Sequence, residues 1–245
     1  MVLSMERFQG KVAVVTGASA GIGASIVEDL VKNGVIVAGL ARRINRVEDL
    51  AKKLSNKKGK LHAFKCDMTK EEEIKEAIGQ VIEKLGPIHI LVNNAGLMQE
   101  ATLINGDTQA WKTTLDTNIL GLCIATREVV QNMKANNTLG HIIHINSVLG
   151  HKIMDFPGLN VYPATKYAVT CLAGSLMSEL KHEKLRIKVT SISPGYVKTE
   201  FQAVAGLPNE TPIPALYGPD VADAVIYALS TPPHVNVNEV TVEAI

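Results

Sequence analysis

Tyr162 and Lys166 are the pair of residues in this sequence whose types and spacing most suggest chemistry, since they stand four residues apart in the segment 162–166. At this spacing two side chains of a helix lie on one face, one turn apart. A phenol has an ordinary pKa of about 10, and a neighbouring ammonium group favours the phenolate and so lowers that pKa. The pair therefore indicates a general acid/base formed by Tyr162 and tuned by Lys166. Any helix can carry such a pair by chance, so the interpretation depends on what accompanies it.

Composition narrows the class of protein that could use this pair. The chain has 245 residues, of which 46% are hydrophobic and 20% charged, as in ordinary globular proteins with a substantial core. Its net charge of +1 provides no electrostatic attraction to nucleic acid or to anionic membranes, so we expect neither as a partner. No run approaches the roughly 18 apolar residues of a membrane span, so we expect no membrane insertion.

Cysteine usage and the N-terminal residues predict a cytoplasmic protein. Cys66, Cys123 and Cys171 are far apart and show no CxxC spacing, so we expect reduced thiols and no disulfide framework. No group of His, Cys or carboxylate residues has the spacing of metal ligands, and we expect no metal. The first ten residues contain no apolar core of a signal peptide.

Short apolar segments alternate with helical patterns along the chain, and this rhythm predicts the fold. Alternating strands and helices form right-handed crossovers, so we expect an α/β protein: a single doubly wound, Rossmann-like parallel sheet of about seven strands with helices on both faces. No linker or repeat divides residues 1–245, which predicts a single domain. Ligands of such sheets bind in the crevice beyond the carboxyl ends of the strands. The expected strands are 12–16, 35–40, 61–66, 88–92, 141–145, 187–192 and a last one around 235–242, and the expected helices include 71–85, 111–134, 163–181 and 221–229.

A glycine-rich turn at residues 17–23 follows the first expected strand and precedes a helical pattern of apolar residues. Glycines let a pyrophosphate approach the backbone, and the free N–H groups and dipole of a helix N-terminus favour anions. A glycine cluster alone is weak evidence, but its place between a strand and a helix favours a dinucleotide-binding turn.

Arg42 and Arg43 follow the second expected strand, where dinucleotide-binding proteins distinguish their cofactors. An acidic residue there binds the 2′-hydroxyl of NAD, whereas an arginine accommodates the 2′-phosphate of NADP. Two arginines and no acid stand there, so NADP(H) is favoured over NAD(H). The other interpretation is that both arginines merely begin a solvated helix that also contains Arg46 and two lysines.

Four motifs, in the order found here, make the chain resemble the short-chain dehydrogenase/reductase family over nearly its whole length. They are Thr16 with the glycine turn, the segment Asn93-Asn94-Ala95-Gly96, Ser147, and the segment 162–166. Within the family, the segments 5–8, 39–43 and 147–151 look most like the farnesol dehydrogenases of insects and a related vertebrate subgroup.

The resemblance implies a role for each member of a catalytic set. Tyr162 would exchange the proton of the substrate oxygen while hydride moves to or from nicotinamide C4. Lys166 would lower the Tyr162 pKa and bind the nicotinamide ribose. Ser147 would hydrogen-bond the substrate oxygen as charge develops on it. Asn118 matches the family asparagine that holds a water linking Lys166 to solvent.

The resemblance also implies the cofactor-binding residues. One departure weakens the preference for NADP: Ala20 stands where many NADP-dependent members have a second basic residue. The residues expected to bind the cofactor are Gly17, Ser19, Gly21, Ile22, Gly23, Arg42, Arg43, Asp67, Met68, Asn94, Ala95, Gly96, Tyr162, Lys166, Pro194, Gly195, Val197 and Thr199.

An apolar substrate pocket is expected next to the catalytic set. The segment 200–220, rich in proline and apolar residues, is interpreted either as a cover over an apolar substrate or as an ordinary surface connection. His144, inside an apolar strand, is interpreted as a core residue. The expected pocket residues are Met98, Leu149, His151, Met154, Phe156 and Leu159, with Val161 as a further apolar wall.

Three functional hypotheses follow. The first is an NADP(H)-dependent oxidoreductase acting on a hydrophobic alcohol or its carbonyl, best an isoprenoid alcohol such as farnesol. The second keeps this chemistry for ketosteroids or dicarbonyls. The third, from another class, is a non-catalytic dinucleotide-binding regulatory protein, which the presence of Tyr162 and Lys166 disfavours. The family resemblance further implies a homodimer or homotetramer.

Overall fold

The seven strands of the protein form one parallel sheet, in a computed structural model that describes residues 3–155, 158–159, 161–201 and 213–245. The strand order is β3-β2-β1-β4-β5-β6-β7, and every neighbouring pair is parallel. The expected fold class is confirmed. The strands are β1 (Val12–Thr16), β2 (Ile36–Ala41), β3 (Lys60–Lys65), β4 (Ile88–Asn93), β5 (His141–Ile145), β6 (Lys188–Pro194) and β7 (Glu239–Val242).

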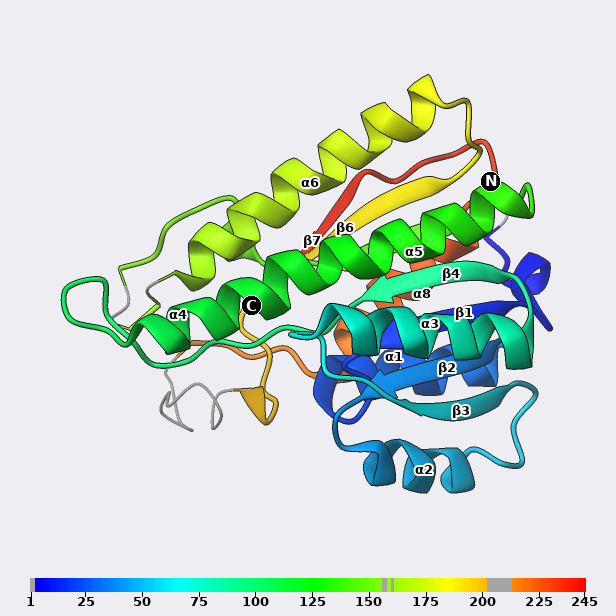
Figure 1. The fold of residues 1–245 in the computed structure, drawn as a ribbon, viewed down its shortest axis with the longest axis horizontal. Coiled ribbons are helices and arrows are strands. Elements are labelled where there is room, and N and C mark those ends of the chain that lie inside the picture. The colour runs from blue at the N-terminus through cyan, green and yellow to red at the C-terminus, as the bar shows by residue number, and fades with distance from the viewer. Residues whose placement is uncertain (1–2, 156–157, 160, 202–212) are drawn as a thin grey trace.

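Helices cover both faces of this sheet (Figure 1). The α-helices are α1 (Gly21–Lys32), α2 (Ile44–Lys53), α3 (Glu71–Leu85), α4 (Thr108–Leu115), α5 (Leu122–Ala135), α6 (Tyr162–His182) and α8 (Gly218–Ser230). Short 3-10 turns are η1 (Glu6–Phe8) and η3 (Val148–Gly150). None of the helices in the described ranges is long and apolar enough to cross a bilayer.

Alternate residues of the buried strands pack against different layers of helices. Ala13 and Val15 of β1 join the cluster that contains the apolar faces of α1 and α8. Val12 and Val14 of the same strand join the cluster built on α3 and α5. Because successive side chains of a strand point to opposite faces, a strand buried on both faces is mostly apolar along its length rather than at alternate positions. All five residues of β1 are buried, which explains the continuous apolar run in its sequence.

The order of the strands reverses between β1 and β4, since the chain runs outward through β2 and β3 on one side and through β5, β6 and β7 on the other. At such a switch point the loops beyond the carboxyl ends diverge and leave a crevice. The glycine turn follows β1, and the segment Asn94-Ala95-Gly96 follows β4, so both flank this crevice.

The segment 111–134 departs from the regular helix expected there. A π-helical turn, η2 (Asp116–Gly121), interrupts the helical run between α4 and α5. Hydrophobic periodicity over a long window does not register one widened turn, which explains why the sequence pattern missed it. Such turns are frequent at functional sites, and this one contains Asn118, whose side chain hydrogen-bonds outside its own helix.

Candidate active site

Tyr162 and Lys166 lie in the first turn of α6, as their spacing predicted. Pro163 occupies the start of this helix, where a missing N–H costs nothing because no helical acceptor exists for it. The Lys166 side chain is 6% exposed, and its Nζ donates a hydrogen bond to the Ile145 carbonyl at 2.8 Å. The same Nζ lies 5.6 Å from the centre of the Tyr162 ring. The end of β5 thus holds the ammonium group beside the phenol.

Ser147 stands two residues beyond β5, at the start of η3. Its Oγ accepts a hydrogen bond from the Leu149 N–H at 3.1 Å, which fixes the rotamer of the side chain. The hydroxyl hydrogen is not used in that bond and remains available to a ligand oxygen.

Asn118 lies behind the wall of the site rather than in it. Its Nδ2 donates to the Leu97 carbonyl at 2.9 Å and to Thr165 Oγ1 at 3.0 Å, and its Oδ1 accepts from the Leu97 N–H at 2.9 Å. Thr165 Oγ1 in turn donates to the Tyr162 carbonyl at 2.7 Å. Asn118 therefore connects the segment after β4 to the first turn of α6. Through Thr165 it helps to fix the backbone of Tyr162.

One cavity of about 430 Å³ brings the other three catalytic candidates together with the glycine turn. Ser147, Tyr162 and Lys166 line it, and so does every residue expected to bind the cofactor. These residues lie at or beyond the carboxyl ends of β1, β2, β3, β4, β5 and β6 or at the starts of α1 and α6, so the convergence predicted for the carboxyl edge of the sheet is found.

Two glycines allow the turn to pack closely against neighbouring backbone and the Asn94 side chain. Gly17 has a φ of 69°, a conformation that L side chains rarely adopt. A Cβ on Gly23 would lie 2.4 Å from the Gly17 carbonyl oxygen and 2.5 Å from Asn94 Nδ2. Asn94 holds the turn in place, since its Nδ2 donates to the Thr16 carbonyl at 2.8 Å.

The N-terminus of α1 fits the pyrophosphate of a dinucleotide. Its cap residue, Ala20, offers no side-chain acceptor, and its first turn contains no acidic residue. The N–H groups there are therefore not used by a side chain of the cap, and no carboxylate of that turn repels an anion.

Arg42 and Arg43 are exposed at the end of β2 and line the same cavity. Arg43 makes an ion pair with Glu200 at 3.0 Å, and its Nη2 donates to Ser19 Oγ at 3.4 Å. Arg46, in the first turn of α2, makes an ion pair with the same carboxylate at 2.7 Å. Sequence patterns did not single out Glu200, since 154 residues separate it from Arg46.

The remaining cofactor candidates lie around these groups. Asp67 Oδ1 accepts hydrogen bonds from the Thr69 N–H at 3.0 Å and from Thr69 Oγ1 at 2.9 Å, which fixes the turn after β3. Thr199 lies against the glycine turn, because a Cβ on Gly21 would be 3.2 Å from its side chain. Val197 pairs with Leu216 in an isolated parallel bridge, which attaches the segment before α8 to the site.

Not all of the apolar residues expected to bind substrate line the cavity, since Val161, which is described, is absent from its wall. Met98, Leu149, Met154 and Leu159 line the cavity. Phe156 lies outside the described residues, as does most of the segment 200–220, so its interpretation as a cover stays a prediction. Phe201 also lines the cavity, and its ring centre lies 5.6 Å from that of Tyr162, which gives the catalytic ring an apolar neighbour.

His151 was expected to line the pocket, but it is not among the described residues that line the cavity. Its Nε2 lies 2.6 Å from Glu239 Oε1 and 3.1 Å from Ser193 Oγ, so the ring faces β6 and β7. A carboxylate on the neighbouring edge strand binds the imidazole better than an apolar pocket can. His144 is a core residue, as expected: it is 1% exposed, and burial lowers its pKa to about 4.

Burial shifts the pKa values of the catalytic pair. For Tyr162 the shift is upward, whereas the spacing of the pair indicated a lowered pKa. Removal from water disfavours charge, so burial raises the pKa of Tyr162 above its ordinary value and lowers that of Lys166 to about 8. The phenol is therefore protonated at neutral pH. The ammonium of Lys166 can stabilise only the phenolate, which forms as the proton leaves.

Comparison with known proteins identifies the family of this chain. A family model described as short chain dehydrogenase matches residues 11–208. The chain is 47% identical over 243 residues to a farnesol dehydrogenase of Aedes aegypti, covering 98% of each protein. The chain belongs to the short-chain dehydrogenase/reductase family. This oxidoreductase is also 41% identical over 249 residues to the dehydrogenase/reductase SDR family member 11 of Gallus gallus, covering 96% of each.

Among solved structures, this short-chain dehydrogenase/reductase is similar to the closed form of a serine dehydrogenase complexed with NADP⁺. The TM-score is 0.83 and the identity 31%, over 94% of each chain. A bound nicotinamide dinucleotide supplies the hydride acceptor or donor of the reaction. The residues of this chain bring to the same cavity a glycine turn at a helix N-terminus, the hydroxyls of Ser147 and Tyr162, and the amine of Lys166.

Proposed function

We propose that this short-chain dehydrogenase/reductase is an NADP(H)-dependent enzyme that interconverts a hydrophobic alcohol and its carbonyl, with an isoprenoid alcohol such as farnesol as the favoured substrate. The observation that carries the proposal is the convergence of Ser147, Tyr162 and Lys166 on one cavity with the glycine turn. We also propose that the enzyme is cytoplasmic, has a single domain and forms a homo-oligomer. Its molecular mass in solution tests the oligomeric state.

The proton and the hydride leave the alcohol by different routes in this proposal. On oxidation the hydroxyl proton would pass to the Tyr162 oxygen, and a bound nicotinamide dinucleotide would accept the hydride from the carbinol carbon. On reduction Tyr162 donates its proton to the carbonyl oxygen that receives the hydride at its carbon. Ser147 hydrogen-bonds the same oxygen and stabilises the charge that develops on it. Because burial keeps Tyr162 protonated, the free site is poised as a proton donor.

Arg42 supports the choice of NADP(H). Among the described residues it makes no ion pair, it is exposed, and it lines the cavity at the end of β2, so it is available to a 2′-phosphate. Charge-assisted hydrogen bonds from a guanidinium to a phosphate are strong and directional.

Arg42→Asp, with Arg43 unchanged, should shift the cofactor preference toward NAD. The substitution removes one guanidinium and adds a carboxylate that repels the phosphate, so we expect the ratio of kcat/KM for NADPH to kcat/KM for NADH to fall by about ten- to a hundredfold. Steady-state kinetics with each cofactor measures the ratio. The NADH efficiency is compared with the wild-type value as well, since the new carboxylate can bind the 2′-hydroxyl of the NADH ribose. An unaltered ratio means that the phosphate does not bind at Arg42.

The apolar wall supports a hydrophobic substrate. Met98, Leu149, Met154, Leu159 and Phe201 line the same cavity as the catalytic hydroxyls, and burial of apolar surface is the main source of affinity for a hydrophobic ligand. The relative from Aedes aegypti, which carries the name farnesol dehydrogenase, supports an isoprenoid in particular.

A substrate panel separates the two enzymatic hypotheses. We expect farnesol with NADP⁺ to give the highest kcat/KM, measured by the absorbance of NADPH, and ketosteroids and dicarbonyls with NADPH to give lower values. A shorter terpene alcohol is the matched comparison, because each methylene removed from a buried chain costs about 0.8 kcal/mol, or roughly fourfold in kcat/KM. A ketosteroid or dicarbonyl that outperforms every terpene alcohol would establish the second hypothesis instead.

A further inference from the structure

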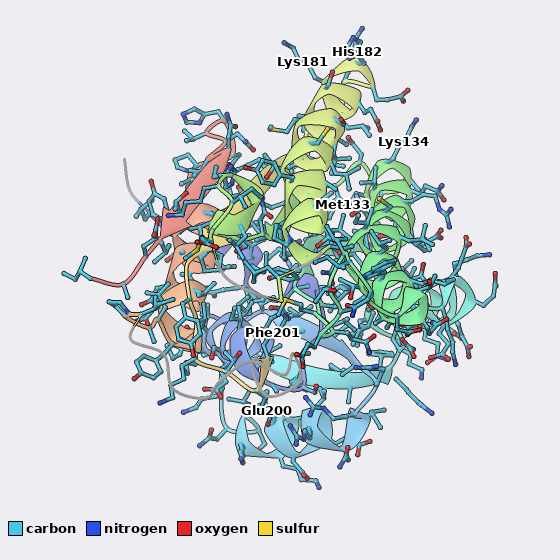
Figure 2. All side chains as sticks on the ribbon, turned by 90° about the vertical axis from the view of Figure 1, so that its left-hand side faces the viewer. Met133, Lys134, Lys181, His182, Glu200 and Phe201 are labelled. Atoms are coloured by element: carbon cyan, nitrogen blue, oxygen red, sulfur yellow. The ribbon has the colours of Figure 1, made fainter. Side chains whose placement is uncertain are left out.

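Glu200 forms ion pairs with two arginines at the expected cofactor site. Those arginines follow β2, whereas Glu200 follows β6. Its carboxylate contacts Arg43 at 3.0 Å and Arg46 at 2.7 Å. The three side chains come from two parts of the chain that are more than 150 residues apart. Figure 2 shows Glu200 beside α2, with Phe201 next to it toward the middle of the molecule.

The ion pair between Arg43 and Glu200 lies within the cavity proposed for the dinucleotide. Both residues line that cavity together with Arg42 and Ser19. Arg43 Nη2 donates to Ser19 Oγ in the glycine turn at 3.4 Å, so the guanidinium reaches from the end of β2 toward the turn. A 2′-phosphate that binds Arg42 and Arg43 must therefore come close to the Glu200 carboxylate.

The two nucleotides meet this carboxylate differently. A phosphate dianion competes with Glu200 for the Arg43 guanidinium and is repelled by its negative charge. A 2′-hydroxyl is uncharged and can donate a hydrogen bond to a carboxylate, which is what the acidic residue at the end of the second strand does in NAD-binding proteins. Here no acid stands at the end of β2, but the carboxylate of Glu200, which follows β6, contacts Arg43 at that place.

We infer that Glu200 is a determinant of cofactor specificity, which weakens the preference for NADP(H) over NAD(H) by holding a carboxylate against Arg43 and Arg46. The inference rests on the proposed dinucleotide-dependent function and adds a residue that opposes the effect of Arg42. Hydrogen bonds from Arg46 and Arg43 hold the pKa of Glu200 below its ordinary value, so the carboxylate is charged at neutral pH.

Glu200→Gln tests this inference, because it removes the charge and keeps the size of the side chain. We expect the ratio of kcat/KM for NADPH to that for NADH to rise about three- to tenfold, mainly through a lower KM for NADPH, since the groups are exposed and screened by solvent. The effect should shrink as ionic strength rises.

Glu243→Gln is the matched control. Glu243 also lines the cavity, is as exposed as Glu200, and contacts a cation, Lys152, at 3.2 Å, but it does not contact the arginines after β2. Its substitution should leave the ratio unchanged. An equal rise in both variants would show a general charge effect and would overturn the role of Glu200, as would an unchanged or lower ratio in Glu200→Gln alone.

Binding of nucleotide fragments separates this inference from the proposed function. Calorimetry with 2′,5′-ADP and with 5′-AMP needs no turnover, and Glu200→Gln should tighten binding of 2′,5′-ADP about three- to tenfold while that of 5′-AMP stays the same or weakens. If the wild-type enzyme turns over no alcohol or carbonyl, the proposed function fails and this shift still supports the inference. Tighter binding of both fragments, or no measurable binding of 2′,5′-ADP to either protein, contradicts it.

Discussion

Tyr162→Phe should lower kcat for both directions by about 10²- to 10⁴-fold, the usual contribution of a general acid or base. The substitution removes only the hydroxyl and keeps the ring, which lies 5.6 Å from Phe201. The cofactor contacts of the glycine turn and of Arg42 do not involve that oxygen, so the Kd for NADPH should change less than about threefold. Stopped-flow measurement of a single turnover, with fluorescence titration of NADPH, tests both statements.

Tyr167→Phe is the control for this experiment. Tyr167 lies on the same helix, α6, but is 41% exposed and does not line the cavity, so the loss of its hydroxyl should have no effect on turnover. Retention of more than a tenth of the wild-type kcat in Tyr162→Phe would assign proton transfer to another group. Loss of turnover in Tyr162→Phe together with an undiminished cellular role would instead revive the hypothesis of a regulatory protein.

Lys166→Met should lower kcat/KM for carbonyl reduction by about a hundredfold. The ammonium lies 5.6 Å from the ring centre of Tyr162, and at an effective dielectric constant of about 20 a charge pair at that separation is worth on the order of 3 kcal/mol. That energy acts only once the phenol has lost its proton, so it stabilises the transition state more than the ground state. Methionine fills a similar volume without the charge.

The same substitution should remove a step from the pH profile. Burial lowers the pKa of Lys166 to about 8, so the ammonium is present below that pH and is lost as pH rises through it. Carbonyl reduction, which needs this charge, should therefore fall above about pH 8 in the wild-type enzyme and show no such fall in Lys166→Met. Oxidation, which needs a phenolate to accept the proton, should rise with pH.

Lys188→Met distinguishes Lys166 from any other buried amine. Burial also lowers the pKa of Lys188 to about 8, but this residue begins β6 at the amino end of the sheet, where its Nζ donates to Thr231 Oγ1 at 2.6 Å. Its substitution should keep the alkaline fall in reduction, whatever it does to stability. Persistence of the fall in Lys166→Met would contradict the assignment.

The amino-acid sequence was sufficient for the fold and for the edge of the sheet at which the candidate residues gather. Continuous apolar runs that end in small polar residues can be satisfied only by strands buried on both faces, and their alternation with helices leaves few topologies. Parallel strands bring their carboxyl ends to one edge, so residues as distant as Gly17, Arg42, Ser147 and Tyr162 could be expected in one crevice before their contacts were known.

The contacts of individual side chains in the site could not be predicted from the sequence, because they depend on the direction in which each side chain points. His151 was expected in the pocket and instead faces Glu239, and Asn118 supports the wall from behind through a π-helical turn. Glu200 reaches Arg43 and Arg46, a contact that no local pattern signals. Short polar motifs reveal which groups are available at a sheet edge, but not which neighbour each of them will bind.

Protonation was the feature for which sequence spacing was most misleading. A lysine four residues from a tyrosine indicates a lowered phenol pKa, whereas burial raises the pKa of Tyr162 and lowers that of Lys166. Sequence distance sets which charges are neighbours, and it carries no information about how much solvent remains around them. Since the desolvation of a charge can exceed the attraction of one neighbouring charge, only the packing of α6 against β5 and the cavity wall could decide the resting state of Tyr162.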